Sequence, residues 1–224
     1  MNIYKNGQYK QNHPTWHDED APFKAQEVLK IIKKNTLKVR SIIDIGCGTG
    51  GVLKILSQKL KVSKLVGFEP YKEVLKIAKT KHPEVDFIDK LPQKKFDLAL
   101  ALDVIEHLEK PKKILLQIKT LAKYKIFHVP LSLSLQARLR KTPPEYGREH
   151  SGHLHNFTKK SALDFLKANN YEILDFSYTK GAILTPIKTR RQKFLNIFRI
   201  LFFPVFPNLT SKLLGGFSLI VLTK

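Results

Sequence analysis

Residues 41–51, with the sequence SIIDIGCGTGG, constrain the fold of this chain more than any other segment. Three isoleucines surround one acidic residue, Asp44, as in a short buried strand, and four glycines follow it. An apolar helical pattern then begins at Val52. Glycine lets the backbone approach a ligand closely, and the first N–H groups of a helix have no intrahelical partner. A strand, a glycine turn and a helix N-terminus therefore predict a site for a nucleotide-sized ligand.

Asp44 decides between two kinds of ligand. Gly46-x-Gly48-x-x-Gly51 also matches the dinucleotide fingerprint, but that motif alone is weak. A carboxylate just before the first glycine would face the pyrophosphate of a dinucleotide, which is another anion. It suits instead a cationic ligand with an α-amino group and a sulfonium. The segment resembles motif I of the class I S-adenosylmethionine-dependent methyltransferases, in which an apolar-Asp-apolar stretch precedes Gly-x-Gly-x-Gly.

The rest of the chain alternates between strand and helix patterns. We predict strands at 41–46, 64–68, 85–88, 97–102, 125–129, 171–178 and 216–222, and helices at 50–60, 71–81, 110–123 and 159–168. This alternation predicts an α/β fold with a parallel sheet and helices on both faces. The resemblance implies a Rossmann-like, doubly wound, seven-stranded mixed sheet whose last strand is antiparallel.

A length of 224 residues predicts a single domain, 1–224. Residues 1–40 are expected to form an N-terminal arm and a helix, opened by Asp18-Glu19-Asp20, whose acids suit the positive end of the helix dipole. Residues 131–157 and 180–214 interrupt the alternation, and we expect both insertions on the acceptor side of the site.

Acidic residues lie at the carboxyl ends of four of the predicted strands, where an open α/β sheet binds its ligand; they are Asp44, Glu69, Asp89 and Asp103. Glu69 lies 23 positions after Gly46, where an acid can accept both ribose hydroxyls, and Asp89 is placed to reach the adenine amine. The backbone near Leu102 and Asp103 is expected to face the amino-acid end of the cofactor. The predicted cofactor-binding residues are Asp44, Gly46, Cys47, Gly48, Glu69, Pro70, Asp89, Leu102 and Asp103.

Two histidine-containing segments are candidates for acceptor chemistry. They are Asp103-Val104-Ile105-Glu106-His107 and 150–157, HSGHLHNF. His107 and His153 are the predicted catalytic residues, because imidazole titrates near neutrality and can take a hydroxyl proton. The alternative for each histidine is a hydrogen bond that stabilises a loop.

The first of these segments resembles the corresponding segment of ubiquinone-type O-methyltransferases and of small-RNA 2′-O-methyltransferases. In those families an acid, a second acid and a histidine hold a divalent metal that binds the acceptor oxygens. The resemblance implies an alternative metal set of Asp103, Glu106 and His107, joined by His153 or His155. Asp103 is shorter than the glutamate usual in the metal-binding members, so we expect no metal and keep this set as the alternative.

Taken end to end, the chain resembles a bacterial group of class I methyltransferases associated with surface-polysaccharide gene sets. The resemblance rests on the motifs at 12–20 (NHPTWHDED), 125–131 (KIFHVPL), 152–158 (GHLHNFT) and 214–219 (LGGFSL). It implies S-adenosylmethionine as cofactor, S-adenosylhomocysteine as product, and O-methylation of a small molecule, a sugar or a glycolipid precursor. It also implies that Trp16 and His17 close over the cofactor or acceptor, although Trp16 serves equally well to attach the arm to the core.

The formal net charge is +21, from 40 Lys and Arg against 19 Asp and Glu. Such a balance suggests an acidic partner, and it leaves open an RNA methyltransferase or a non-catalytic protein at a lipid surface. Only seven of the basic residues are arginine and no RNA-binding module is present, so nucleic acid is the weaker alternative. The basic and apolar stretch 188–206 suits contact with an anionic membrane, but we favour a helical cover over the acceptor pocket.

One cysteine, Cys47, excludes an internal disulfide framework, and the N-terminal segment has no apolar core of a signal peptide. The longest apolar run, 194–206, is interrupted by Asn196, Arg199 and Pro204 and is too short to span a bilayer. We therefore expect a cytoplasmic protein.

Overall fold

Strands and helices alternate in the computed structural model, which describes residue 11 and residues 14–139, 152–184 and 189–224. The strands are β1 (Ser41–Ile45), β2 (Lys64–Phe68), β3 (Asp86–Ile88), β4 (Phe96–Leu102), β5 (Ala122–Pro130), β6 (Ile173–Thr179) and β7 (Ser218–Thr223). The helices are α2 (Ala21–Lys34), α3 (Gly51–Lys59), α4 (Lys72–Lys81), α5 (Pro111–Leu121), α6 (Leu135–Leu139), α8 (Lys159–Ala168), α9 (Gly181–Leu184), α10 (Arg190–Phe202) and α11 (Pro207–Leu214). Two 3₁₀ turns, η1 (Asp18–Asp20) and η2 (Ile105–His107), complete the set.

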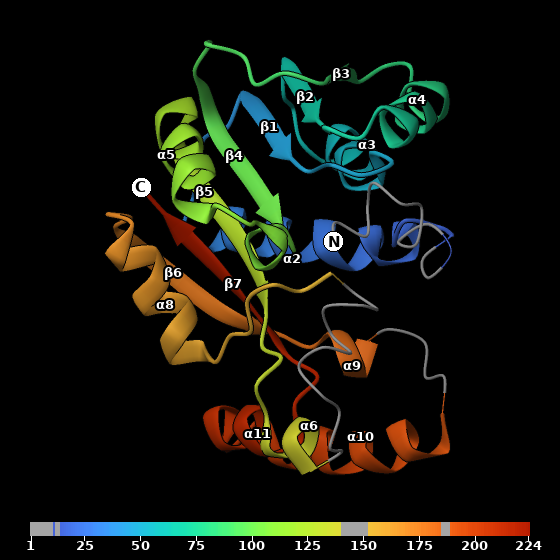
Figure 1. Cartoon of the computed structure of the whole chain (residues 1–224), viewed down its shortest axis with the longest axis vertical. Helices are drawn as coiled ribbons and strands as arrows, with labels where there is room; N and C mark the ends of the chain where they lie inside the picture. Colours follow the sequence, from blue (N-terminus) through green and yellow to red (C-terminus); the bar gives the residue numbers. More distant parts are fainter. Residues whose placement is uncertain (1–10, 12–13, 140–151, 185–188) are drawn as a thin grey trace.

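The strands form one seven-stranded sheet in the order β3-β2-β1-β4-β5-β7-β6 (Figure 1). Strands β1 to β5 pair in parallel, and β7 runs antiparallel to both β5 and β6. The predicted mixed sheet with an antiparallel last strand is confirmed. The chain winds outward from β1 in one direction and from β4 in the other, so the switch point lies where β1 and β4 end.

Side chains alternate between the two faces of the sheet and bury two apolar layers. On one face Ile42, Leu98 and Leu100 pack with α2, α3 and α4. On the other face Ile43 and Phe127 pack with α5 and α8. The prediction of helices on both faces is therefore confirmed, and the central strands read as apolar runs because both faces are covered.

The ends of several elements differ from the predicted ones. The helix predicted at 110–123 ends at Leu121, because β5 begins at the next residue without an intervening loop. The strand predicted at 171–178 begins at Ile173. The three acids before α2 form η1 and make no side-chain capping bond to that helix. Instead Asp18 accepts hydrogen bonds from Thr49 Oγ1 and Lys81 Nζ, both at 2.7 Å.

Both insertions leave the sheet at the edge where the parallel strands end. Strand β5 leads into α6, and β6 leads into α9 and α10. Helix α11 leads into β7, which is antiparallel and therefore starts at this same edge. Figure 1 shows α6, α10 and α11 gathered beyond the tips of β1 and β4. Within the described ranges, no helix is long and apolar enough to cross a membrane.

Candidate active site

The glycine turn after β1 is fixed by backbone and carboxylate contacts from β2. The N–H groups of Gly46 and Cys47 donate to the carbonyl of Phe68, at 2.8 and 3.1 Å. Gly46 and Gly48 have φ values of +70° and +55°, in the left-handed region that disfavours other residues. The carboxylate of Glu69 accepts the N–H of Gly48 at 3.1 Å and that of Tyr71 at 3.0 Å. Glu69 thus holds the turn against the tip of β2.

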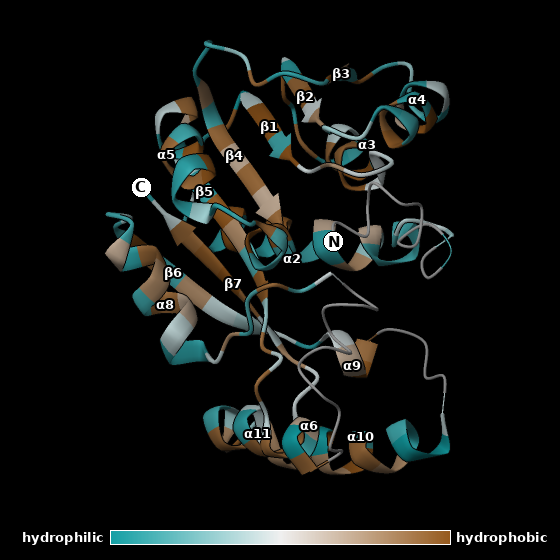
Figure 2. Cartoon of the chain, in the orientation of Figure 1, coloured by the Kyte–Doolittle hydropathy of each residue, from teal (hydrophilic) through white to brown (hydrophobic). Residues whose placement is uncertain are grey.

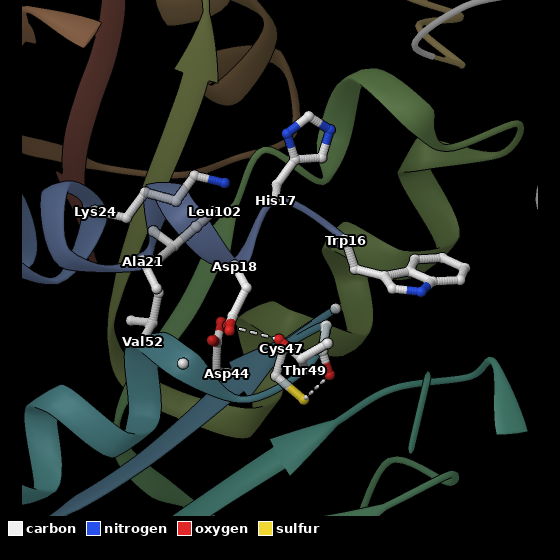
Figure 3. A pocket seen from close by; sticks show the side chains of 13 residues that line it. Trp16, His17, Asp18, Ala21, Lys24, Asp44, Cys47, Thr49, Val52 and Leu102 are labelled. Atoms are coloured by element: carbon white, nitrogen blue, oxygen red, sulfur yellow. Dashed lines mark hydrogen bonds between the residues drawn. The ribbon is translucent and has the colours of Figure 1, made fainter. Parts of the chain in front are cut away.

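A pocket opens between this turn, the end of β4 and the segment that leads into α2 (Figure 3). The space inside it is about 420 Å³ when the open solvent at its mouth is counted. It is lined by Trp16, His17, Asp18, Ala21, Lys24, Asp44, Gly46, Cys47, Gly48, Thr49, Gly51, Val52 and Leu102. Five of the nine predicted cofactor residues are in this set, and the helix before β1 contributes residues that were not predicted.

Asp44 is the buried acid of the pocket. Its residue is 3 % exposed, and its Oδ1 has no hydrogen-bond partner. Burial raises the pKa of Asp44 to about 7, with a further increase from Glu69 and an opposing effect from Lys24. A buried carboxylate oxygen without a donor is costly unless a ligand satisfies it. Asp44 is therefore suited to receive a cationic N–H group.

The predicted residues outside the lining set lie around the pocket. Asp103 lies in the loop after β4, next to Leu102, and Glu69 holds the glycine turn through the N–H of Gly48. Pro70 is exposed beside Glu69, and Asp89 is exposed directly after β3. The tips of β2 and β3 are adjacent, because the N–H of Glu69 donates to the carbonyl of Ile88 at 3.0 Å.

Asp103 is held by a chain of polar side chains that crosses three elements. One of its oxygens lies 2.8 Å from Lys24 Nζ on α2, and the other accepts from His128 Nδ1 on β5 at 2.5 Å. His128 Nε2 lies 2.8 Å from the hydroxyl of Thr179 at the end of β6. Burial alone would raise the pKa of Asp103, but His128 and Lys24 outweigh it and hold that pKa well below its usual range. Asp103 also has a left-handed φ of +58°, a strained conformation for a residue with a side chain.

Lys24 and His128 were missed by the sequence reasoning. Burial would lower the pKa of Lys24, but the facing carboxylate of Asp103 outweighs it and raises the pKa to about 12. A signal for Lys24 was present: it lies three residues after Ala21 and four before Val28, on the buried stripe of α2. A lysine on such a stripe needs an acid opposite it. His128 gave no such signal, because it lies between the apolar residues Phe127 and Val129 and no acid on its own strand indicates a partner.

Glu106 and His107 on η2 meet His153 from the second insertion. The ligand atoms of these three side chains lie within 4.8 Å of one another. The rings of His107 and His153 pack edge to face with their centroids 4.9 Å apart. The carbonyl of Glu106 accepts the N–H groups of Leu154 and His155, at 2.7 and 3.0 Å, which fixes this insertion against η2. The structure thus brings together the two predicted catalytic histidines.

The protonation of this cluster is set by burial. Glu106 is 1 % exposed, neither of its carboxylate oxygens has a hydrogen-bond partner, and burial raises its pKa well above the usual value. Burial, together with His153, lowers the pKa of His107 to about 4, and burial also lowers the pKa of His153. His107 Nδ1 lies 3.1 Å from the carbonyl of Gly152, which can only accept, so this nitrogen carries the proton. Nε2 is then the basic nitrogen of His107 and lies on the side of Glu106, 3.8 Å from its Oε1.

Two residues of the alternative metal set point elsewhere. Asp103 is engaged by Lys24 and His128, and His155 Nε2 donates to the carbonyl of Leu108 at 2.9 Å. The remaining candidate ligands are the carboxylate of Glu106 and the imidazoles of His107 and His153. Such a combination can bind Zn²⁺, Mn²⁺ or Fe²⁺. His150 of the predicted second segment lies outside the described residues.

Trp16 and His17 line the pocket from the segment before η1. Both have left-handed backbone conformations, with φ values of 54° and 59°. Consecutive residues with side chains in this region are strained, and such strain is concentrated at functional sites. Whether they close over a ligand, as the resemblance implied, stays a prediction.

A family model described as a methyltransferase domain matches residues 16–175. This range includes the glycine turn, Lys24 and both histidines of the cluster. A search of curated proteins finds no significant match.

Among solved structures, the chain is similar to the magnesium protoporphyrin IX methyltransferase of Synechocystis PCC 6803 with bound S-adenosylmethionine. The identity is 15 % and the TM-score 0.55, over 96 % of this chain and 82 % of that one. It is similar to a possible histamine N-methyltransferase of Thermotoga maritima at 20 % identity and a TM-score of 0.60, over 99 % of each chain. It is also similar to the plantazolicin methyltransferase BpumL, at 16 % identity and a TM-score of 0.60, over 97 % of this chain and 88 % of that one. At these identities the likeness shows the fold.

Proposed function

The chain belongs to the methyltransferase domain family and is an S-adenosylmethionine-dependent enzyme, and on this premise we propose that it methylates a hydroxyl oxygen. The proposed acceptor is a small molecule, a sugar or a glycolipid precursor. The observation that carries this proposal is the pair of half-buried imidazoles, His107 and His153, which pack edge to face and whose pKa values are lowered by burial.

Different residues of the pocket suit different parts of the cofactor. Asp44 offers its carboxylate oxygen to the α-amino group of the methionine moiety, and the glycine turn leaves room for its backbone to approach. Glu69 and Asp89, at the adjacent tips of β2 and β3, are placed to receive the ribose hydroxyls and the adenine amine. The methyl group would then point toward the loop of Asp103 and η2.

His107 suits an acceptor that is a neutral hydroxyl. In this reaction a bond forms between the methyl carbon and the acceptor oxygen while the carbon–sulfur bond breaks, and the electron pair stays on sulfur. The acceptor oxygen becomes an oxonium, whose proton is strongly acidic. A base whose conjugate acid has a pKa of about 4 can accept that proton, and before the transfer it accepts a hydrogen bond that orients the hydroxyl.

A divalent metal fits the same residues. Glu106, His107 and His153 would hold it, and the orphaned carboxylate of Glu106 is the observation that favours such a group. When bound, the metal would act as a Lewis acid on the acceptor oxygen. Without it, burial holds the pKa of Glu106 well above its usual value, and His107 is the proposed base.

The cofactor assignment is tested by calorimetric titration with S-adenosylmethionine and S-adenosylhomocysteine. We expect Asp44→Asn and Glu69→Gln each to weaken binding by about tenfold or more, since each loses a charge-assisted hydrogen bond of about 1.5–3 kcal/mol. Wild-type affinity should rise with pH between about 5.5 and 7.5, because the cation binds the ionised form of Asp44, whose pKa is about 7. Asp44→Asn should lose that pH dependence. Failure of a folded wild-type sample to bind either compound would overturn the cofactor assignment.

The acceptor is sought by methyl transfer to nucleotide sugars, lipid-linked glycans, small phenols and RNA, with and without added Mg²⁺, Mn²⁺ or Zn²⁺. With the acceptor found, His107→Ala should lower kcat by about 10²–10⁴ while binding of S-adenosylmethionine is retained. His155→Gln is the matched control, because its ring is bonded to a backbone carbonyl away from the cluster. Transfer to RNA alone, weakening steeply with salt, would replace the small-acceptor proposal.

A further inference from the structure

Helix α10 is amphipathic, but its polar side faces the protein and its apolar side faces outward. Its buried residues are polar, Asn196 and Arg199, each 3 % exposed. Its outer face presents Phe194, Ile197 and Leu201, which are 61 %, 55 % and 63 % exposed. In an ordinary surface helix the apolar stripe faces the core and the polar residues face water.

The buried polar side chains of α10 have hydrogen-bond partners, so placing this side of the helix against the protein leaves neither Asn196 nor Arg199 unpaired. Asn196 Nδ2 donates to the carbonyl of Ala182 at 2.6 Å. Arg199 donates to the carbonyls of Gly215 and Leu214 at 2.9 and 2.8 Å, and to Asn196 Oδ1 at 2.7 Å. Helix α10 is therefore anchored by hydrogen bonds on its inner face, which leaves its apolar side chains for the outside.

The apolar surface continues over the neighbouring helices. Helix α11 also buries polar residues, Thr210 and Ser211, while α6 buries Gln136. We call the outward face of α6, α10 and α11 the apolar platform. Its exposed large apolar side chains are Leu135, Leu139, Phe194, Ile197, Ile200, Leu201, Phe202, Val205, Phe206, Leu209 and Leu213. Figure 2 shows apolar residues on these three helices, at the end of the molecule that lies beyond the strand tips. Contiguous exposed patches of this kind mark an interaction site.

Among the described residues, the charges on α10 and α11 have one sign. Arg190, Arg191 and Lys193 are exposed at the start of α10, and Lys212 is exposed on α11. The sequence contains no Asp or Glu after Asp175. Lys188, predicted as part of the same basic stretch, lies outside the described residues. A cationic rim around exposed aromatic and aliphatic side chains complements a surface that is anionic at its head groups and apolar beneath them.

We propose that the apolar platform docks on an anionic phospholipid bilayer. Phe194, Ile197 and Leu201 enter the head-group boundary, and the cations at the start of α10 contact the lipid phosphates. The platform lies at the edge of the sheet where the parallel strands end, so the same edge that carries the cofactor pocket faces the membrane. An acceptor held in the bilayer by a lipid tail would reach this edge without leaving the membrane.

A second copy of the chain fits this surface less well. An isologous dimer would bring the same cations of two highly basic chains together, and like charges across an interface are unfavourable. The charge pattern therefore selects the lipid surface.

The test is sedimentation of the full chain with vesicles of phosphatidylcholine, with and without phosphatidylglycerol. We expect the wild type to sediment with the phosphatidylglycerol vesicles and added salt to weaken the binding. Phe194→Ser/Leu201→Ser should weaken partitioning by about tenfold or more, since two large apolar side chains no longer enter the lipid. Arg190→Gln/Arg191→Gln should weaken binding only to the anionic vesicles.

Matched controls use exposed residues of the same kind elsewhere. Leu116→Ser/Leu174→Ser removes two apolar side chains, 67 % and 41 % exposed, on α5 and β6. Lys112→Gln/Lys113→Gln removes two exposed cations of α5. Both controls should bind vesicles as the wild type does. Binding of S-adenosylmethionine, measured on every variant, reports folding and the proposed function separately from docking.

Three results would overturn the proposal. The folded wild type could remain in solution with every vesicle. The platform variants could bind as well as the controls do. The wild type could also elute as a dimer that Phe194→Ser/Leu201→Ser converts to a monomer, which would make the platform a subunit interface.

Discussion

Two carboxylates three residues apart, Asp103 and Glu106, lie in opposite surroundings. Asp103 has an ammonium and an imidazole as partners, and its pKa is held low. Glu106 has no hydrogen-bond partner at either oxygen, and burial raises its pKa. The first carboxylate is engaged by the protein, so its charge holds α2, β4 and β5 together. We propose that the second is available to a ligand, such as the divalent metal considered above. The two carboxylates therefore differ in what surrounds them, although one short loop carries both.

The largest effect is expected from Asp103→Asn. The substitution leaves the ammonium of Lys24 without a countercharge and His128 Nδ1 without its carboxylate, and losing one member of such a partly buried network costs about 3 kcal/mol of unfolding free energy. The folded-state pKa of Asp103 is below its unfolded value, so its contribution is present above the unfolded pKa and is lost as the pH falls below it. Urea unfolding near neutral pH measures the loss.

Asp164→Asn is the matched control for this prediction. Asp164 pairs with Lys160 one turn away on α8, where both side chains are more than half exposed, so its loss should cost little. If both variants lost equal stability, the network around Asp103 would have no special role.

A smaller change of opposite sign is expected from Glu106→Gln. The folded state keeps a proton on Glu106 that the unfolded chain releases above its ordinary pKa, so the free energy of unfolding of the wild type declines as the pH rises. Glutamine removes this dependence and should raise the free energy of unfolding at neutral to mildly alkaline pH, by less than the loss expected for Asp103→Asn. Urea unfolding over a range of pH measures both the increase and the slope. An unchanged slope would contradict the assignment.

The same variant tests the metal site without an acceptor. If Zn²⁺ or Mn²⁺ binds Glu106, His107 and His153, the metal should raise the Tm of the wild type and raise that of Glu106→Gln much less. An equal rise in both proteins would exclude Glu106 as a ligand.

The smallest effect is expected at the far end of the Asp103 network. Thr179→Val keeps the shape of the side chain but removes the hydroxyl beside His128 Nε2, which should cost about 1 kcal/mol. Thermal unfolding should show a decrease of a few degrees, without loss of S-adenosylmethionine binding. A decrease as large as that of Asp103→Asn would mean that the hydroxyl, and not the ion pairs, organises the network.

The sequence predicted the sheet well because its strands are local apolar runs separated by helices of clear periodicity. It also placed Asp44 and the glycine turn correctly in the fold, since a strand, a turn and a helix are contiguous there. The partners of Asp103 could not be predicted in this way. Lys24 lies 79 positions before Asp103 and His128 lies 25 positions after it, and only the packing of α2 and β5 brings them together.

The orientation of the helices in the second insertion could not be predicted for another reason. Sequence patterns report how apolar and polar residues alternate, but not which side faces the core. For residues 188–206 the sequence predicted a helical cover over the acceptor pocket, but the pattern did not indicate which side chains of α10 would be buried. The structure buries Asn196 and Arg199.

The hydrogen bonds of Arg199 have a consequence for how this protein can change over time or by design. Its guanidinium secures α10 through the backbone carbonyls of Leu214 and Gly215, and neither hydrogen bond involves a side chain of the outer face of α10. The anchor is therefore indifferent to the identity of the side chains on the opposite face. The side chains at those outward positions can therefore be substituted to change what the surface binds, while Arg199 and Asn196 keep α10 in its place on the fold.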